Sequence, residues 1–523
     1  MTGIFNKKYA IYWILALAVI VRIIGLTKCF QGDEFFSVID ARSLAAIPDA
    51  LLLDTHPPLY FYLLNFWMKI SASEAFLRIL SIIPGIGLCL AVYLIGRYIF
   101  DEMSGIVSAL LVALAPIAVW SSQYVRTYSL AAFFTVLSVY FLLRILKEKK
   151  ASNADWAGYI LFSAASIYTF YFSALIIIAE NIYMAAYIRK KKFWLKWLLS
   201  QAAVLALYIP WLPYFFFQRS SYVSHPQMID KVGFYIGRIH VGGIIRSIAG
   251  LAGFDPRLYS KRLVSGEGFF VALVVAFVLA GMILAIWRAV EFFRSSKAGP
   301  KEGRFVELLF FLAILPFLMA LLIHQAFGIV LMSHYFIASF VFLALFFTAV
   351  VVKTVSKRTG AVILAIVILL YSSRLFAMYL DNEMDFRSAH SYIKTAMAGE
   401  TFVVSPSFGG VFDHYFSDIP NRGYMEDLRT FAVLGKDVIA ITYPTKFELR
   451  RVHDAFKRFL WSHDYVLASS RPAGDLIIER YVKSPADRHP EAPPLALPGH
   501  RPGGKGPKDL KTDSSSGLRP SSE

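Results

Sequence analysis

The sequence predicts an α-helical polytopic membrane protein with about eleven transmembrane helices and a small outer α/β domain near its C-terminus. Three observations predict this class. The 523-residue chain is 57% hydrophobic and 17% charged, with a mean hydropathy of +0.56, whereas soluble domains carry about a quarter charged residues. Several apolar runs exceed the roughly 18 residues needed to cross a bilayer. Most Lys and Arg residues fall in short segments between these runs, which is typical of membrane topology.

The apolar runs define the predicted spans when about 20 residues are allowed for each helix. Residues 156–188 are too many for one untilted span, and basic clusters at 147–150 and 189–192 flank them. This run therefore should cross twice, as a hairpin that turns near Tyr171. The other spans are predicted at residues 9–28, 75–100, 104–121, 128–146, 193–217, 269–290, 305–324, 330–352 and 361–379. The first has no small-residue cleavage site after it, so we interpret it as a retained anchor rather than a signal peptide.

The basic segments indicate which side of the membrane each connection faces. Residues 7–8, 147–150, 189–192, 287–304 and 353–358 all fall on one side of the predicted spans. The positive-inside rule makes that side cytoplasmic, so the N-terminus is predicted inside. Residues 29–74, residues 218–268 and everything after Asp381 then face outward. Because topology accounts for the net charge of +17, we do not expect nucleic acid as a partner.

The chain divides into three predicted parts: transmembrane residues 1–380, an outer α/β domain at 381–483 and a disordered tail at 484–523. The outer domain is predicted from alternating helix and strand patterns. Helices are expected at 385–399 and 445–461, and strands at 400–406, 436–444 and 475–482. The tail is rich in Pro, Gly, Ser and Lys and cannot bury a core. The two cysteines, Cys29 and Cys89, predict neither a disulfide nor a metal site.

The first outer segment, residues 29–74, carries a carboxylate pair directly after the first span. Asp33 and Glu34 stand in the stretch GDEFFS, and we expect interfacial helices at 37–53 and 54–67. A carboxylate here can deprotonate a hydroxyl, bind a metal or simply be solvated, and an isolated Asp-Glu pair is most often solvated or a helix cap. His56, which precedes two prolines, is by itself more often a structural residue than a ligand.

Three stretches together resemble a known family. GDEFFS, THPPLYFYLLNFW (55–67) and SSQYVRTYSLAAFF (121–134) resemble the GT-C integral-membrane glycosyltransferases, in the branch of protein mannosyltransferases and of aminoarabinose transferases that act on lipid A. Residues 166–183 and 385–406 are similar to bacterial members of this branch. The resemblance covers roughly residues 9–482 and implies a GT-C fold.

The resemblance implies a reaction in the bacterial cytoplasmic (inner) membrane. A sugar carried on a polyprenyl phosphate is transferred at the outer face to an acceptor hydroxyl, by a single displacement with inversion. The acceptor (a protein, lipid A or a glycan) stays open. Asp33 matches the family's general base, and Glu34 would orient the site or help to hold a cation. A divalent cation is left open, because the sequence shows no clear ligand set.

The resemblance also implies residues that contact the substrate. Arg126 would stabilise the phosphate, with Gln123 on the same helical face if the helix extends that far and with Tyr128 beside it. The alternative for Arg126 is an arginine that snorkels to lipid headgroups. His56 matches the family's His-Pro-Pro element and would touch substrate.

Two positions depart from the family pattern. Phe170 stands where members often carry histidine, and His334 with Tyr335 stands where they often carry Arg-Tyr. His334 would either donate to the phosphate, with a charge that depends on pH, or pack between helices. Arg22, near an outer helix end, is accounted for by snorkelling.

The second outer segment is long and basic, which is typical of functional loops. Arg219, Lys231, Arg238 and Arg246 would form a lid over a lipid phosphate or bind anionic headgroups.

Two other function classes compete with a glycosyltransferase. A transporter or flippase of a lipid-linked sugar would show inverted repeats and broken helices near the midplane, and the sequence shows neither. A non-catalytic assembly or sensor protein would bind a glycan through the outer domain. Substitution of Asp33 would separate these classes from an enzyme.

Overall fold

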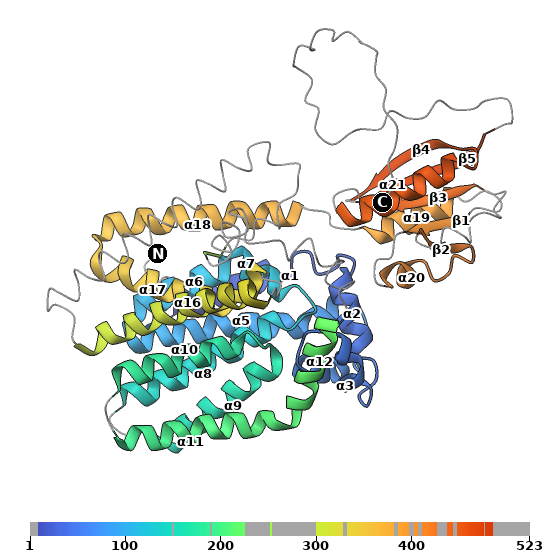
Figure 1. Ribbon diagram of the computed structural model, residues 1–523. Helices are drawn as coiled ribbons and strands as arrows, with labels where there is room; N and C mark the ends of the chain where they lie inside the picture. The colour runs from blue at the N-terminus through green and yellow to red at the C-terminus, as the bar shows by residue number, and fades with distance from the viewer. Residues whose placement is uncertain are drawn as a thin grey trace, which may run out of the picture.

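A bundle of membrane-type helices forms most of the protein (Figure 1). The computed structural model describes residues 9–148, 151–188, 191–224, 252–253, 300–327, 332–380, 385–396, 402–405, 410–425, 437–442, 447–474 and 476–484. The predicted span at 269–290 and almost all of the predicted tail lie outside these residues. Among the described helices, six are long and apolar enough to span a membrane, or seven if one bent pair is counted as a single span.

The helices of the bundle follow the predicted apolar runs. They are α1 (Ala10–Ile23), α5 (Glu74–Ile99), α6 (Glu102–Leu114), α7 (Pro116–Ser122), α8 (Tyr128–Lys147), α9 (Asn153–Thr169), α10 (Ser173–Tyr187), α11 (Lys191–Tyr208), α16 (Pro300–Phe327), α17 (Ile337–Thr354) and α18 (Lys357–Leu380). The predicted turn near Tyr171 is present, since α9 and α10 are separated only by residues 170–172. The ends of α8 and α11 near the basic clusters lie at the end of the bundle far from the C-terminal domain (Figure 1).

The span predicted at 104–121 is not one straight helix but two helices, α6 and α7, bent by 62°. The break is at Ala115, whose backbone is extended (φ −63°, ψ 121°). Pro116 follows, and a proline ring disfavours the helical conformation of the residue before it. The bend turns the short helix α7 toward the first outer segment, where the residues after it enter the site.

The predicted interfacial helix at 37–53 is also wrong. The chain forms α2 (Gly32–Asp40), α3 (Ile47–Ala50) and a short 3-10 helix η2 (Leu51–Leu53). Pro48 lacks a backbone N–H donor and fits only the first turn of a helix, so α3 begins anew there. Ile47 and Leu51 are fully buried in the protein rather than in a lipid surface. The second predicted helix is present as α4 (Leu59–Met68).

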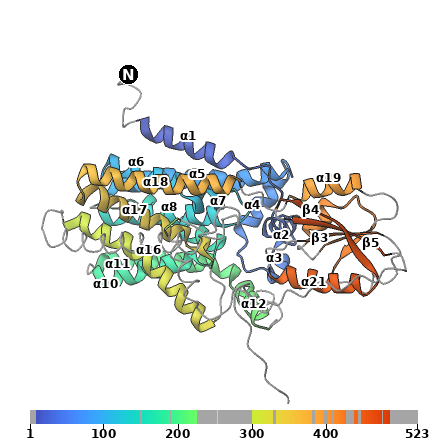
Figure 2. The same ribbon diagram turned by 90° about the horizontal axis from the view of Figure 1, so that it is seen from above.

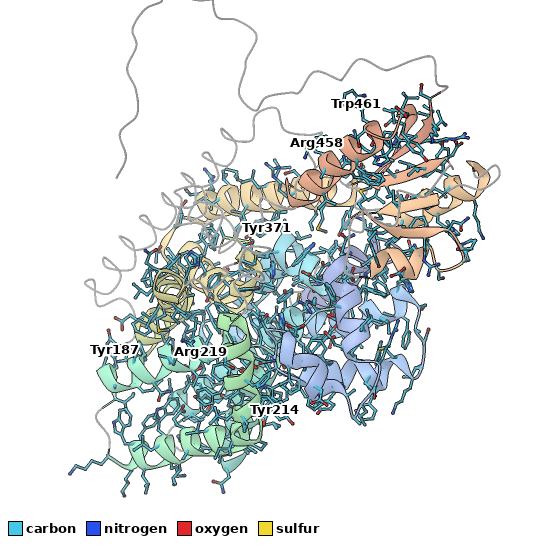
Figure 3. The ribbon with its side chains drawn as sticks, turned by 45° about the vertical axis from the view of Figure 1, so that its right-hand side comes forward. Tyr187, Tyr214, Arg219, Tyr371, Arg458 and Trp461 are labelled. Atoms are coloured by element: carbon cyan, nitrogen blue, oxygen red, sulfur yellow. The ribbon has the colours of Figure 1, made fainter. Side chains whose placement is uncertain are left out.

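The helix that enters the second outer segment is longer than expected. After η3 (Ile209–Trp211), α12 (Leu212–Ser224) continues beyond the predicted boundary at 217. Gln218 on α12 is buried, and its Nε2 donates to the carbonyl oxygens of Leu51 (2.6 Å) and His56 (3.2 Å). These bonds hold α12 beside the first outer segment, where Figure 3 shows Tyr214 and Arg219 along it.

The C-terminal domain is a mixed sheet with helices on both faces (Figure 2). Its strands, in the order β2-β1-β3-β5-β4, are β1 (Phe402–Ser405), β2 (Arg422–Tyr424), β3 (Val438–Thr442), β4 (Tyr465–Ala473) and β5 (Leu476–Lys483). β1 pairs parallel with β2 and β3, whereas β5 pairs antiparallel with β3 and β4. The domain's helices are α19 (Phe386–Ala396), α20 (Val411–Tyr415) and α21 (Phe447–Trp461).

Alternation along β3 explains the two layers of this domain. Ile439 and Ile441 belong to the core shared with α19 and the first outer segment, and Val438 and Ala440 belong to the core under α21. Sequence patterns predicted three of the strands but missed β2 and β4. β2 has only three residues, and β4 is an edge strand whose middle residues are exposed, so neither shows the alternation of a half-buried strand.

A close contact of glycines between α5 and α6 generates a stability prediction. A Cβ on Gly105 would lie 2.7 Å from the carbonyl oxygen of Tyr93, and one on Gly96 would lie 2.8 Å from the Cα of Gly105. Small residues let membrane helices approach closely. We expect Gly105→Ala to destabilise the protein by about 1–3 kcal/mol, because the backbones must separate. Thermal unfolding in detergent measures this effect. Gly360→Ala in α18 is the matched control, since its nearest neighbours are 3.4 Å away; equal unfolding temperatures for the two variants would contradict the prediction.

Candidate functional site

The carboxylate of Glu34 is buried in an ion pair that fixes the start of α2. Its Oε1 accepts from Arg78 Nε (2.9 Å) and the Val125 N–H (3.1 Å), and its Oε2 accepts from Arg78 Nη2 (2.8 Å) and the Gln31 N–H (3.0 Å). Gln31 is the N-cap, so the last bond is half of a capping box. Glu34 is 1% exposed. Both of its oxygens are therefore engaged by the protein itself.

Asp33 directly precedes Glu34 in the first turn of α2, but its side chain is exposed. Its negative charge acts on Arg126 and Tyr128. Its backbone oxygen accepts from Ser37 Oγ (3.1 Å), which in turn accepts from Arg126 Nη1 (3.1 Å). The structure thus places a free carboxylate at the edge of a site whose cation is Arg126.

Arg126 lies in the connection between α7 and α8 and is buried. Its Nη1 is 3.6 Å from Asp54 Oδ2. The predicted common helical face for Arg126 and Gln123 is wrong, because α7 ends at Ser122 and α8 begins at Tyr128. The amide of Gln123 instead donates to the carbonyl oxygens of Arg22 (3.0 Å) and Ile24 (2.6 Å), and so caps the end of α1.

Asp54 and His56 form a pair beside Arg126. His56 Nδ1 lies 2.5 Å from Asp54 Oδ1. Burial alone would raise the pKa of Asp54, but His56 and Arg126 hold that pKa below its usual range. The ionised carboxylate can only accept, so Nδ1 carries a proton and Nε2 points elsewhere. Within the described part of the chain, His56 Nε2 and Arg126 Nε are both buried without a hydrogen-bond partner.

Aromatic rings surround this pair of nitrogens. His56 stacks on Phe170 with centroids 5.8 Å apart. Tyr128 lies 4.4 Å from His334, and Phe170 lies 5.1 Å from Tyr335. His334 and Tyr335 come from a 3-10 turn, η5 (Ser333–Phe336), at the start of α17. The structure therefore brings His56, Arg126, Tyr128, His334 and Tyr335 together, and Phe170 fills the position between them.

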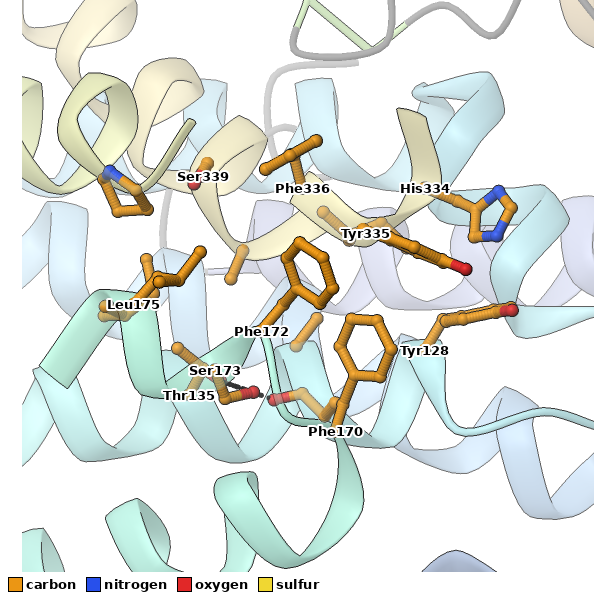
Figure 4. A pocket seen from close by; sticks show the side chains of 16 residues that line it. Tyr128, Thr135, Phe170, Phe172, Ser173, Leu175, His334, Tyr335, Phe336 and Ser339 are labelled. Carbon is orange, nitrogen blue, oxygen red and sulfur yellow. Dashed lines mark hydrogen bonds between the residues drawn. The ribbon is translucent and has the colours of Figure 1, made fainter. Parts of the chain in front are cut away.

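An apolar pocket continues from these rings into the bundle (Figure 4). Tyr128, Phe170, His334 and Tyr335 lie at one end of this narrow pocket. The rest of its wall is mainly apolar: Ala131, Ala132, Phe172, Leu175, Ile176, Pro316, Phe336, Ile337 and Ala338. Thr135, Ser173 and Ser339 add polar groups to this wall.

The described residues include no group of three or more His, Cys, Asp or Glu side chains that could hold a metal ion. Glu34, the expected helper for a cation, already accepts four hydrogen bonds. Asp33 is thus the single carboxylate of the pair with free oxygens, so the described side chains do not fit a cation held by protein alone.

Several functional residues were missed from sequence. Arg78 and Asp54 had detectable signals: an arginine inside a predicted span, and an acid two residues before a histidine. Gln218 had none, because its importance arises only from folding. Snorkelling is wrong for Arg22, which is fully buried and donates to Ser122 Oγ (3.2 Å) and the Ala113 carbonyl (3.2 Å). Of the predicted lid, Arg219 is exposed on α12, and Lys231, Arg238 and Arg246 lie outside the described residues.

Comparison with known proteins identifies the fold. The family profile described as dolichyl-phosphate-mannose-protein mannosyltransferase matches residues 55–214, less than half of the chain. The crystal structure of the apo oligosaccharyltransferase of Archaeoglobus fulgidus is similar, with a TM-score of 0.50 and 12% identity, over 93% of this chain and 75% of that one. The same enzyme tethered to an acceptor peptide with the NVT sequon gives 0.50 and 13%, over 92% and 74%.

A third similar structure is ArnT from Cupriavidus metallidurans bound to undecaprenyl phosphate, with a TM-score of 0.49 and 12% identity, over 90% of this chain and 97% of that one. No curated protein sequence matches this chain. The similarity to the oligosaccharyltransferase confirms the fold class predicted from the sequence.

The buried pair of Glu34 and Arg78 predicts a large stability loss. Glu34→Gln keeps the shape of the side chain but leaves the Arg78 cation without its anion, which should cost about 3–5 kcal/mol. Thermal unfolding in detergent and the yield of folded protein measure it. The control is Glu102→Gln, whose partner Arg97 is 58% exposed, and which should cost below about 1 kcal/mol. Equal losses in the two variants would contradict this assignment.

Asp40, at the end of α2, predicts a pH-dependent stability. Burial, and then the charge of Asp54, raise the pKa of Asp40 to about 7. The folded state therefore holds this proton more tightly than the unfolded chain, and the stability it contributes is lost as pH rises from about 4 through 7. Asp40→Asn should raise the unfolding temperature at pH 8 and change it little at pH 5. The gain should be about 1 kcal/mol after allowance for solvent screening. An increase in unfolding temperature that is the same at pH 5 and pH 8 would refute this prediction. Asp49→Asn, at an exposed position, is the control.

Proposed function

We propose that this chain, whose fold is that of an integral-membrane oligosaccharyltransferase, is a glycosyltransferase that moves a sugar from a polyprenyl-phosphate donor to an acceptor hydroxyl. The observation that carries the proposal is the juxtaposition of two unpartnered buried nitrogens, His56 Nε2 and Arg126 Nε, with the exposed carboxylate of Asp33. An anion site next to a free base is what transfer from a phosphate ester requires. The matching family profile, which names a dolichyl-phosphate sugar donor, supports the choice of donor.

The donor phosphate would bind at Arg126 and His56. The first turn of α8, which begins at Tyr128, adds backbone N–H groups that lack partners within the helix. Asp54 accepts from His56 Nδ1, so Nε2 is the ring nitrogen left to face the phosphate. The lipid's first isoprene units would lie in the apolar pocket below Tyr128 (Figure 4).

Asp33 would act as the general base. As the acceptor oxygen attacks the anomeric carbon, its proton passes to the Asp33 carboxylate, and the bond between that carbon and the phosphate oxygen breaks. Polyprenyl phosphate leaves with the electron pair, and Arg126 stabilises the charge. One displacement inverts the configuration, and no step requires an acid, because phosphate is already a good leaving group. Glu34 orients Asp33 through Arg78, and no step is assigned to a cation.

The orientation in the membrane follows from the charge pattern. The basic ends of α8, α11 and α18 lie at one end of the bundle, and the first outer segment and the C-terminal domain lie at the other (Figure 1). The positive-inside rule puts the first end, with the N-terminus, in the cytoplasm. The site then faces the outside of a bacterial inner membrane, where the acceptor is a protein, lipid A or another glycan.

Release of polyprenyl phosphate tests this function. Purified protein in nanodiscs would receive a panel of radiolabelled polyprenyl-phosphate sugars together with a cell-envelope acceptor extract. We expect wild type to release lipid phosphate. In Asp33→Asn the rate of release should fall by a factor of about 10²–10⁴, the range for a missing general base. Donor binding should be retained in Asp33→Asn and weakened in Arg126→Gln. Asp49→Asn, an exposed acid of the same outer segment, is the control.

Equal release by wild type and Asp33→Asn would refute the base assignment. If wild type releases no lipid phosphate with any donor, the assignment as an enzyme is refuted. Translocation of the same lipids across vesicle membranes then becomes the test of a flippase.

A further inference from the structure

The segment between α1 and α2 is held from two sides. From inside, Arg78 donates to the carbonyl oxygens of Leu26 (2.7 Å), Lys28 (2.7 Å) and Cys29 (3.2 Å). This guanidinium also binds Glu34, one residue after Asp33. The position of α2 therefore depends on where residues 26–30 lie.

From outside, the C-terminal domain binds backbone groups of the same segment that Arg78 does not bind. Arg387 on α19 donates to the Thr27 carbonyl (2.6 Å) and pairs with Glu74 Oε2 (2.6 Å). Tyr415 on α20 accepts from the Phe30 N–H (2.7 Å), three residues before Asp33. Its hydroxyl donates to Glu74 Oε1 (2.7 Å). Glu74 is the first residue of α5, so this set of bonds ties the domain to the bundle as well.

Ring contacts place the same domain against α2 itself. The His414 ring lies 5.2 Å from that of Phe35, and Phe35 is buried. Gly410 has φ +81°, and a Cβ there would lie 3.1 Å from the Phe35 ring. The glycine is thus needed both for its backbone conformation and for the close approach. Phe35 is two positions after Asp33, so the domain touches the chain on both sides of the proposed base.

We propose that the C-terminal domain positions the catalytic base: Tyr415, with Glu74 and Arg387, clamps residues 27–30 and so sets the place of Asp33. This inference rests on the proposed function for the role of Asp33, but not for the clamp itself. Tyr415, Glu74 and Arg387 are positioning residues, because none of them reaches the reacting atoms. The Phe30 N–H is the most sensitive part, since without Tyr415 a buried donor loses its partner.

Cys29 supplies a probe of the clamp that needs no activity. It lies inside the clamped segment and is buried, whereas Cys89 is buried in the middle of α5. The experiment alkylates the full-length protein in nanodiscs with a small maleimide, and peptide mass spectrometry reads the two thiols separately. Tyr415→Phe keeps the ring that stacks on Phe386 at 5.3 Å and removes only the hydroxyl. Tyr424→Phe, whose hydroxyl donates to Asp413 on the same domain, is the control.

In Tyr415→Phe we expect alkylation of Cys29 to rise about tenfold, the population change that one lost hydrogen bond allows. The Tyr415 hydroxyl lowers the pKa of this thiol, so its loss makes the thiol itself less reactive, and a rise in labelling reports exposure. Labelling of Cys89 should not change, and the unfolding temperature should fall only slightly, because the hydrogen bonds of one hydroxyl are lost. The kcat for transfer should fall about tenfold with the donor KM within twofold, because only the base is misplaced. Arg387→Gln should act in the same direction, and Tyr424→Phe should match wild type.

Unchanged labelling of Cys29 in both Tyr415→Phe and Arg387→Gln overturns the clamp. Faster labelling of Cys29 with an unchanged kcat overturns its positioning role, and parallel increases at Cys29 and Cys89 show general loosening instead. If wild type transfers no sugar, the proposed function fails, and the labelling alone still decides whether the clamp exists.

Discussion

The guanidinium of Arg78 is the contact on which the rest of the site depends. It neutralises the buried Glu34 carboxylate and binds three carbonyl oxygens of the chain that leaves α1. A buried charge is stable only when it is paired and fully hydrogen-bonded. Since these bonds join α5 both to Glu34 at the start of α2 and to the connection before it, they fix the helix that carries Asp33. Glu34 also accepts from the Val125 N–H, so the chain next to Arg126 is fixed by the same carboxylate.

This arrangement explains why two adjacent acids have different environments. Successive residues of a helix point about 100° apart, so the inward side chain, Glu34, is buried, whereas the side chain of the preceding residue, Asp33, is exposed. The inward acid is used for structure and the outward acid stays free for chemistry. Charge is balanced a second time around Arg126, where Asp54 holds both this arginine and His56. The side chains of Arg126 and His56 thus stay ordered, while one nitrogen of each has no hydrogen-bond partner among the described residues.

The C-terminal domain is packed against the first outer segment. A sheet whose one face packs on α19, α20 and the first outer segment shares a core with that segment, as Phe35, Phe412 and Ile439 show. The hydrogen bonds of this domain to residues 27–30 connect it to the chain before Asp33. The bundle, the first outer segment and the outer domain are therefore coupled through a few backbone groups next to the proposed base.

Composition and periodicity by themselves determined the fold class, the hairpin of α9 and α10 and most strands of the outer domain, because apolar runs and alternation follow directly from burial. A family resemblance added the candidate residues Asp33, His56 and Arg126, whose roles stay predictions. Only the tertiary structure separated Asp33 from Glu34, joined Asp54 to His56, and assigned Gln123 to the end of α1. The helices expected at 37–53 and 104–121 are interrupted next to Pro48 and Pro116, a local signal that the apolar pattern did not reveal. Glu34 binds Arg78, 44 residues away in sequence, and Gln123 binds Ile24, 99 residues away, and local patterns carry no information about which distant groups will meet.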